Sequence, residues 1–199
     1  MTSRHYTKGV LEIIEVSPEL IYMQRIKKPL HQIWANGVNG TLYDSNGSVM
    51  ILVNNGKVLG KNAYWNGWNA PPRPVIYYTS GQLKYELVKS VDELKTSVKE
   101  IDWAVGGGSL PFNPSEKWGT DVTRPTAERT AMAIKDGKVY LIVSKIGMSL
   151  LELGNKIQIN LSPDKMIFLD GGGSTQMYFN KSIKKSNRAV DNGIFIKGD

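Results

Sequence analysis

Residues 165–177 read KMIFLDGGGSTQM and combine a predicted buried strand with a turn of unusual backbone freedom. The apolar run at residues 166–169 is typical of a buried strand. Asp170 ends that strand and is followed by small and polar residues, Gly171, Gly172, Gly173, Ser174 and Thr175. Consecutive glycines let a ligand approach the main chain closely, and their N–H groups can converge on an anion. The stretch predicts a catalytic or binding corner at Asp170, although a plain glycine-rich turn capped by an aspartate would also fit.

The composition is that of an ordinary globular protein with a basic balance. A chain of 199 residues is long enough for one domain with a substantial core. The 25 Lys and Arg residues against 18 Asp and Glu give a net charge of +7. This balance favours an anionic partner such as a phosphate, a nucleic acid or an anionic wall polymer. The absence of cysteine excludes disulfides and thiolate metal sites, and two histidines are too few for a His-rich site, so we predict no metal and no cofactor.

No targeting or membrane segment is recognisable in the sequence. The N-terminal residues MTSRHYTKGV lack the apolar core of a signal peptide, and no stretch approaches the ~20 apolar residues of a membrane span. We therefore expect a soluble, cytoplasmic protein that does not associate with membranes. The oligomeric state is left open by the sequence.

Turn signals predict a chain built mostly of antiparallel strands. Strands at residues 10–16 and 20–26 are expected to form an N-terminal hairpin, residues 1–29, at the edge of a sheet. Asn-Gly pairs between residues 36 and 56 predict a meander, because both residues accept positive φ. Its strands are expected near residues 41–43, 49–53 and 57–59. Further strands are predicted near residues 74–79 and 83–88, and a hairpin with strands at 128–135 and 138–145 is predicted from the Asp136-Gly137 turn.

Two capping boxes predict helices. Ser90–Glu93 would begin a helix over residues 91–99, and Ser149–Glu152 would begin one that ends near Gln158. Together with the strands, they predict an α+β fold: a single domain over residues 1–199, with a curved, mostly antiparallel β core and two or more packed helices.

Several other segments have features of a binding site. Residues 106–109 repeat the sequence Gly-Gly-Gly-Ser without a preceding aspartate, so they are expected to supply backbone donors rather than a carboxylate. The aromatic loop at residues 61–73 would suit stacking on sugars or bases, or a lid packed on the core. The long connection at residues 111–126 is of a kind that is usually functional or mobile. Arg129 would suit a phosphate or a carboxylate, or a salt bridge at a sheet edge.

In this order the segments resemble the phosphodiester glycosidase family. Four matches carry the resemblance: GVNGTLYDSNG at 37–47, AVGGGSLP at 104–111, ERTAMAIKDGKVYLIV at 128–143 and FLDGGGSTQM at 168–177. Weaker matches are GMSLLELG at 147–154 and NRAVDNGIFI at 187–196. The resemblance covers about residues 30–198. It implies hydrolysis of a sugar-1-phosphodiester, which releases the sugar and leaves a phosphomonoester on the other partner.

The resemblance also implies a set of site residues. The predicted catalytic residues are Asp170 and Arg129. The predicted substrate-binding residues are Asn39, Gly40, Asp44, Gly107, Gly108, Ser109, Gly171, Gly172, Gly173, Ser174, Thr175 and Arg188. They are expected to meet in a cleft formed by the turns at 39–44, 106–109 and 170–174 together with Arg129.

The chemistry assigns hypothetical roles to these residues. Cleavage at the anomeric carbon builds oxocarbenium character, which a carboxylate such as Asp170 can stabilise or attack. Phosphate leaves easily and needs charge stabilisation, which Arg129, the amides of residues 171–173 and a second clamp at Arg188 would supply. The candidates for a second carboxylate are Asp44, Asp121, Glu128 and Asp191.

The sequence departs from the family pattern at two places. Leu42 and Tyr43 stand where many relatives have two phenylalanines, and the connection Lys145–Gly147 is shorter than usual, which changes one expected pocket wall. The alternative function is therefore a non-catalytic or sequestering protein for a sugar-phosphate, nucleotide-derived or cell-wall glycan ligand, of phage or bacterial origin. A nucleic-acid partner is not expected, because the basic residues are dispersed and no recognised motif is present.

Overall fold

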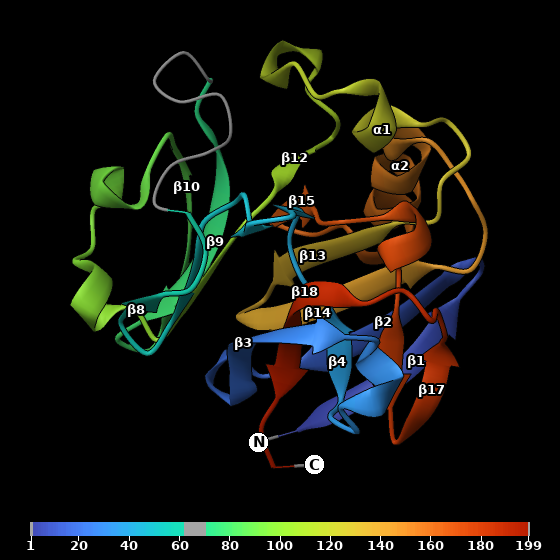
Figure 1. Cartoon of the computed structure of the whole chain (residues 1–199), viewed down its shortest axis with the longest axis horizontal. Coiled ribbons are helices and arrows are strands. Elements are labelled where there is room, and N and C mark those ends of the chain that lie inside the picture. The colour runs from blue at the N-terminus through green and yellow to red at the C-terminus, as the bar shows by residue number, and fades with distance from the viewer. Residues whose placement is uncertain (1, 62–70, 199) are drawn as a thin grey trace.

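Antiparallel sheets form the core of the computed structural model, which describes residues 2–61 and 71–198 (Figure 1). The tyrosine and tryptophans of the predicted aromatic loop, Tyr64, Trp65 and Trp68, lie outside the described residues. In sheet order, the largest sheet consists of β1 (Ser3–Lys8), β2 (Leu11–Val16), β14 (Lys138–Ser144), β13 (Thr130–Lys135), β15 (Lys165–Phe168) and β12 (Gly108–Leu110).

Two five-stranded sheets and one small hairpin complete the described β structure. The first sheet contains β17 (Lys181–Lys184), β16 (Met177–Phe179), β4 (Gly37–Asn39), β18 (Val190–Ile196) and β3 (Ile21–Lys28). The second contains β10 (Gln82–Val88), β9 (Arg73–Thr79), β11 (Trp103–Gly106), β7 (Leu52–Asn54) and β8 (Lys57–Val58). The hairpin pairs β5 (Tyr43–Asp44) with β6 (Gly47–Ser48).

Helical structure is sparse. The α-helices are α1 (Thr120–Thr123) and α2 (Leu150–Leu161). Short 3-10 turns are η1 (Pro18–Leu20), η2 (Leu30–Gln32), η4 (Val91–Glu93), η5 (Val98–Glu100), η6 (Pro114–Glu116) and η7 (Gly172–Ser174). No helix of the described residues is long and apolar enough to cross a membrane. The predicted α+β fold with a mostly antiparallel core is confirmed.

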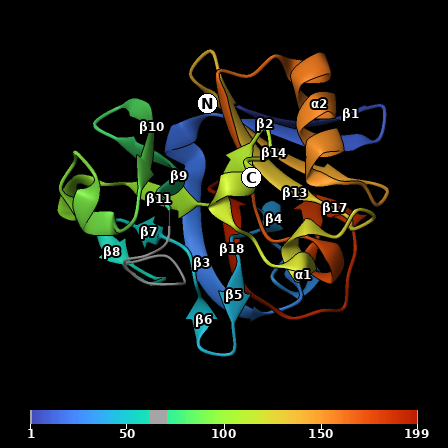
Figure 2. The same ribbon diagram turned by 90° about the horizontal axis from the view of Figure 1, so that it is seen from above.

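The largest sheet is the middle layer of the molecule, because alternate side chains along its strands enter two different apolar cores. On one face, Ala131 and Ala133 of β13 pack in the same core as Leu153 and Ile157 of α2. On the other face, Met132 joins the core shared with β3, β4 and β18. Figure 2 shows α2 beside β13 and β14, with β3 and β18 on the far side of these strands.

The helix predicted from the second capping box is confirmed, and so are the strands predicted near 74–79 and 83–88 and the hairpin at Asp136-Gly137. The Ser149 hydroxyl accepts a hydrogen bond from the Glu152 N–H at 3.1 Å, and α2 continues three residues past the predicted end at Gln158. β9 pairs with β10, and β13 pairs with β14. In the second hairpin, Asp136 and Gly137 both have positive φ, as a tight two-residue turn requires.

The helix predicted over residues 91–99 is wrong. This segment contains only the separate turns η4 and η5, and the Ser90 side chain makes no capping hydrogen bond. The Lys95 N–H donates to the Glu86 carboxylate of β10 at 3.2 Å. Hydrogen bonds to this strand compete with those that a helix would make, so the capping signal does not propagate.

The predicted pairing of residues 10–16 with residues 20–26 is wrong, because these two strands enter different sheets and the hairpin within residues 1–29 pairs β1 with β2 instead. β2 lies between β1 and β14, and β3 pairs with β18. The connection between them is anchored elsewhere: the Pro18 carbonyl accepts from Trp103 Nε1 at 2.8 Å, and Ser17 Oγ accepts from Lys138 Nζ at 2.7 Å. β2 is therefore an interior strand rather than an edge strand.

The predicted meander has the expected hairpin turns, but its strands do not form one continuous sheet. Asn55 and Gly56 join β7 to β8 with φ of 47° and 70°, as an Asn-Gly hairpin turn requires. β7, however, also pairs with β11, whereas β5 and β6 form a sheet of their own. The short β5–β6 hairpin is thereby separated from the sheet that β7 joins.

Candidate active site

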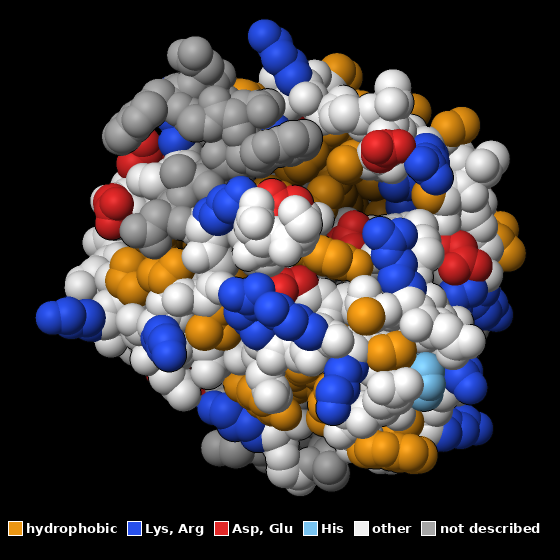
Figure 3. Space-filling model, viewed as in Figure 1, with side chains coloured by type: hydrophobic (Ala, Val, Ile, Leu, Met, Phe, Trp, Pro, Cys, Tyr) orange, Lys and Arg blue, Asp and Glu red, His pale blue; other side chains and the backbone are white. Residues whose placement is uncertain are grey.

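A cavity of about 660 Å³ is lined by segments that lie far apart in the sequence. Its walls come from the region around β5, from the start of β9, from residues 117–129 with α1, from the turn at 169–173, and from Arg188. The face of the molecule in Figure 3 is hollowed, and basic and acidic side chains lie close together along the rim. In this lining, Lys and Arg outnumber Asp and Glu by five to three, which suits an anionic ligand.

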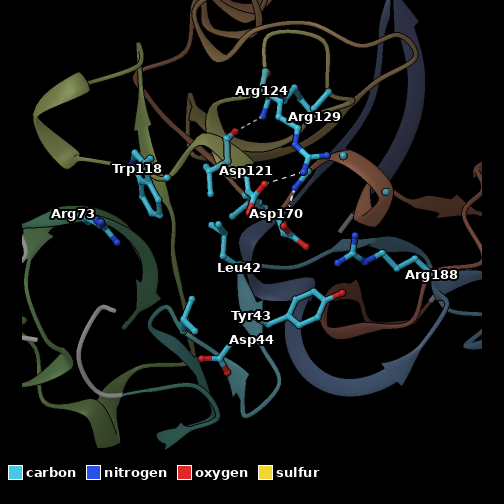
Figure 4. A pocket seen from close by; sticks show the side chains of 18 of the residues that line it. Leu42, Tyr43, Asp44, Arg73, Trp118, Asp121, Arg124, Arg129, Asp170 and Arg188 are labelled. Atoms are coloured by element: carbon cyan, nitrogen blue, oxygen red, sulfur yellow. Dashed lines mark hydrogen bonds and ion pairs between the residues drawn. The ribbon is translucent and has the colours of Figure 1, made fainter. Parts of the chain in front are cut away.

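Asp170 lies in the middle of the cavity wall in the close view of Figure 4. Its backbone is fixed by the predicted Asn-Gly turn: the Asp170 carbonyl accepts from Asn39 Nδ2 at 2.8 Å, and its N–H donates to the Gly40 carbonyl at 3.3 Å. Asn39 itself is buried and is held by Thr130, whose hydroxyl donates to Asn39 Oδ1 at 2.8 Å. Asn39 and Gly40 do not line the cavity, and in this structure they position Asp170.

The carboxyl group of Asp170 has an unusual proton affinity. Burial raises its pKa from 3.8 to about 6, because the surrounding protein disfavours the charged form. The Ser174 hydroxyl, the charge of Arg188 and the Gly171 N–H oppose this effect, since each stabilises the carboxylate. A group with this pKa can exchange a proton near neutral pH, as general acids and bases do.

The glycine turn that follows Asp170 is shaped by contacts within the protein. Gly172 has φ of +61°, and its N–H donates to the Glu128 carbonyl at 2.6 Å. The Gly171 N–H donates to the Asp170 side chain at 3.1 Å. Both amides are thus engaged, so the predicted ring of phosphate-binding amides is not free in this structure, although all three glycines line the cavity.

Arg188 comes from a segment that is tied down on both sides of it. Gln176 Nε2 donates to the Arg188 carbonyl at 3.0 Å, Tyr43 Oη donates to the Ala189 carbonyl at 2.9 Å, and Ser186 Oγ donates to the Gly173 carbonyl at 2.7 Å. Within the described part of the chain, the Arg188 guanidinium makes no hydrogen bond or ion pair, and its charge acts on Asp170 through space. Arg188 therefore offers its charge to a ligand, as a phosphate clamp requires.

Arg129 also lines the cavity, but its side chain is engaged. Its Nε donates to the Met148 carbonyl at 2.8 Å, its Nη1 to the Val122 carbonyl at 2.7 Å, and its Nη2 to the Arg124 carbonyl. Burial lowers the pKa of this guanidinium. In this structure Arg129 therefore braces the loop that carries α1, and its predicted contact with phosphate stays a prediction.

The four candidates for a second carboxylate separate into two groups. Asp44 and Asp121 line the cavity, where Asp44 pairs with Lys61 and Asp121 with Arg124, at 3.1 and 2.8 Å. The other two lie outside the lining: Glu128 pairs with Lys184 at 2.5 Å, and Asp191 pairs with Arg25 at 2.6 Å.

The other predicted binding residues do not line the cavity. Gly107 and Gly108 pack against Phe168, and the Ser109 hydroxyl donates to Glu116. Ser174 and Thr175 are buried behind the turn, and Ser174 acts on the cavity only through its bond to Asp170. The turn at 106–109 does meet the other two, because the Thr41 hydroxyl donates to the Gly106 carbonyl and Gly107 and Gly108 pack on Phe168, but it does not line the cavity.

Several cavity residues were not predicted as ligands. They are chiefly Arg73, Lys117, Trp118 and Arg124. The length of the connection at 111–126 signalled three of them as a group, and Arg73 is the last residue of the predicted aromatic loop at 61–73, although it was not singled out there. Within residues 2–61 and 71–198, no three His, Cys, Asp or Glu side chains cluster as a metal site would require, and metal independence stays a prediction.

The family model for phosphodiester glycosidases matches residues 34–197, so the chain belongs to the phosphodiester glycosidase family. It is similar to the catalytic domain of zebrafish N-acetylglucosamine-1-phosphodiester alpha-N-acetylglucosaminidase auto-inhibited by its pro-peptide, with a TM-score of 0.75 and 14% identity over 100% of this chain and 82% of that one. A hypothetical protein from Synechocystis gives a TM-score of 0.57 and 15% identity over 98% and 61% of the two chains. A search of curated proteins found no match. Family and fold together support a glycosidase-type hydrolase.

Proposed function

We propose that this protein hydrolyses a sugar-1-phosphodiester at the bond between the anomeric carbon and the phosphate oxygen. Water supplies the new hydroxyl group on the sugar, and the phosphate leaves as a monoester of the other alcohol. The observation that carries this proposal is the position of Asp170, with a pKa of about 6, in the same cavity as Arg188, whose guanidinium makes no hydrogen bond or ion pair with the described residues.

The proposed roles follow from the chemistry of the two ends of the broken bond. As the C1–O bond breaks, positive charge develops on the sugar ring, and the Asp170 carboxylate stabilises it and accepts a proton from the attacking water. Negative charge develops on the departing phosphate, and Arg188 neutralises it beside Gly173. A phosphate monoester needs no general acid, so a single inner carboxylate suits this reaction, with Asp44 and Asp121 left to bind hydroxyl groups.

A second candidate function is binding of the same ligand without cleavage. Two observations favour it. The Arg129 guanidinium donates its hydrogen bonds to backbone carbonyls, and the other two cavity carboxylates, Asp44 and Asp121, are paired with cations. A site with one inner carboxylate and one available arginine could hold a sugar phosphate without assembling a full catalytic set. The cavity residues would then act as ligands rather than as catalysts.

A hydrolysis screen read by mass spectrometry distinguishes these functions. The substrates are N-acetylglucosamine-1-phosphodiesters, UDP-N-acetylglucosamine, teichoic-acid fragments and cyclic ADP-ribose-type nucleotides, each with and without a chelator. We expect turnover of one class, with Asp170→Asn reducing it at least about a hundredfold, as loss of a general base does. Asp92→Asn is the matched control, because Asp92 is exposed in η4 and does not line the cavity.

Each alternative outcome has a definite meaning. Full turnover by Asp170→Asn would remove Asp170 from the mechanism. A compound that is retained by the protein but recovered unchanged would support the binding function. Loss of activity in chelator would show that the reaction needs a metal.

A further inference from the structure

The wall of the cavity opposite Arg188 is apolar and aromatic. In Figure 4, Asp170 lies between Arg188 on one side and Trp118 with Arg73 on the other, and Leu42 lies between Asp170 and the tryptophan. Leu42 and Leu169 both line the cavity and are largely buried. If the phosphate lies at Arg188 and C1 lies at Asp170, the sugar ring extends toward this wall.

Trp118 is held rigidly from three directions. The Arg73 guanidinium lies over one face of its ring, 3.7 Å from the centroid, and the Phe168 ring is inclined at 65° to the indole at a centroid distance of 5.2 Å. Its Nε1 donates to the Glu116 carboxylate at 2.5 Å. An indole with a fixed orientation loses little conformational entropy when a ligand stacks on it, so its contact contributes more to affinity.

The carboxylate that holds Trp118 is itself buried and satisfied. Glu116 is 1% exposed, and it accepts hydrogen bonds from the backbone N–H of Ser109 at 3.1 Å and from the Ser109 hydroxyl. The Glu116 carbonyl also accepts from Arg73 Nη2 at 3.0 Å. A buried charge with this many donors orients its partners strongly, because moving any of them would leave the charge unsatisfied.

This arrangement has a use beyond packing. A pyranose ring has apolar faces of C–H groups and polar edges of hydroxyl groups, and its apolar face suits an aromatic ring. We propose that Trp118 is the specificity-determining platform that stacks on the sugar ring of the substrate, and that Glu116 is a positioning residue that sets the angle of the indole. This inference rests on the proposed function, since it takes the location of the phosphate and of C1 from it.

Binding of uncleavable ligands tests the platform separately from catalysis. The probes are C-glycosyl phosphonates of glucose and N-acetylglucosamine, in which CH₂ replaces the glycosidic oxygen, and methylphosphonate, which lacks the sugar. Affinity is measured by calorimetry on the full chain. We expect Trp118→Ala to weaken the sugar phosphonate about tenfold and methylphosphonate less than about twofold, since stacking affects only the ring.

Two further variants separate the platform from its support. Trp118→Phe should recover part of the affinity, because an aromatic face remains. Glu116→Gln should weaken only the sugar phosphonate and should change the near-ultraviolet circular dichroism of the folded protein, as a reoriented indole would. Trp34→Ala is the matched control: that ring is 77% exposed, packs against Tyr178 and does not line the cavity.

The overturning results differ for the two proposals. If Trp118→Ala weakens both probes equally, or neither of them, Trp118 is no sugar platform, while the proposed function stands. If the unmodified protein binds methylphosphonate but neither sugar phosphonate, this inference fails and the proposed function stands; if it binds none of the three probes, both fail.

Discussion

The sequence Gly-Gly-Gly-Ser occurs twice in this chain, and its two copies need glycine for different reasons. At residues 106–109 the reason is packing: a Cβ on Gly107 would lie 2.3 Å from the Phe168 carbonyl oxygen, and one on Gly108 would lie 2.0 Å from the Phe168 ring. At residues 171–174 the central glycine is needed for conformation, because Gly172 has φ of +61° and a Cβ there would meet nothing within 4 Å, although a Cβ on Gly171 would lie 2.8 Å from the Glu128 carbonyl oxygen. One copy lets two strands approach closely, and the other shapes a cavity wall.

The serines that end the two copies show the same contrast. Each donates a hydrogen bond to a carboxylate, Ser109 to Glu116 and Ser174 to Asp170. Glu116 is buried and accepts three donors from the protein, whereas Asp170 faces the cavity and has a raised pKa. The same local sequence therefore supports packing in one place and forms a cavity wall in the other, where the proposed function assigns it a chemical role.

The largest difference in stability is expected between variants of the two arginines near the second copy, Arg129 and Arg188. Arg129→Ala should lower the free energy of unfolding by about 3 kcal/mol, because it leaves three backbone carbonyls without their donor. Arg188→Ala should cost less than about 0.5 kcal/mol but weaken methylphosphonate binding, since Arg188 is exposed. Urea unfolding and calorimetry measure the two effects. An Arg129→Ala variant that is stable but cannot bind phosphate would restore Arg129 as a direct ligand.

The next largest difference in stability is expected between a glycine of the first copy, Gly108, and one of the second, Gly173. Gly108→Ala should lower the free energy of unfolding by about 2 kcal/mol, because the new methyl group overlaps the Phe168 ring. Gly173→Ala should change stability little, since its methyl group would approach Arg188 only to 3.4 Å, an ordinary contact. Instead we expect it to weaken phosphate binding. Equal stability of the two variants in urea would mean that the first copy is not required for packing.

The pH dependence of stability should identify Asp170 in the second copy. Its pKa is higher in the folded protein than its ordinary value of 3.8, so the folded state binds the proton more tightly. The stabilisation is complete below pH 3.8 and is lost as the pH rises through about 6. Asp170→Asn lacks this loss and should gain roughly 2–3 kcal/mol over the parent between pH 4 and pH 7.5. Parallel stability curves for the parent and Asp170→Asn would contradict the raised pKa, and Asp92→Asn is the control.

The smallest effects are expected from replacing the two serines, Ser109 and Ser174, and they concern the pH–rate profile and the stability. Ser174→Ala removes a donor that stabilises the Asp170 carboxylate, so the midpoint of the pH–rate profile should rise by about half a unit. Ser109→Ala should leave that midpoint unchanged and cost about 1 kcal/mol in stability, because Glu116 loses one hydrogen bond. An equal shift of the midpoint by both variants would mean that the two copies are not functionally distinct.

Local signals in the sequence were sufficient for much of the fold and for the central residue of the site. Tight turns such as Asp136-Gly137 and the cap at Ser149 were predicted correctly, because each depends on residues within a few positions of one another. Asp170 was identified in the same way, from an apolar run that ends at a carboxylate and three glycines. The family was likewise recognisable from the order of its motifs.

Only the tertiary structure decided which of these residues meet. Nothing near residues 91–99 reveals that Glu86 of β10 takes the Lys95 N–H, and nothing near Pro18 reveals that Trp103 anchors the turn that sends β3 into another sheet. The occupation of Arg129 by carbonyls and the support of Trp118 by Glu116 likewise depend on partners that other strands and loops supply. A sequence determines which groups a residue carries, but burial and hydrogen bonding across the fold determine whether those groups remain available to a ligand.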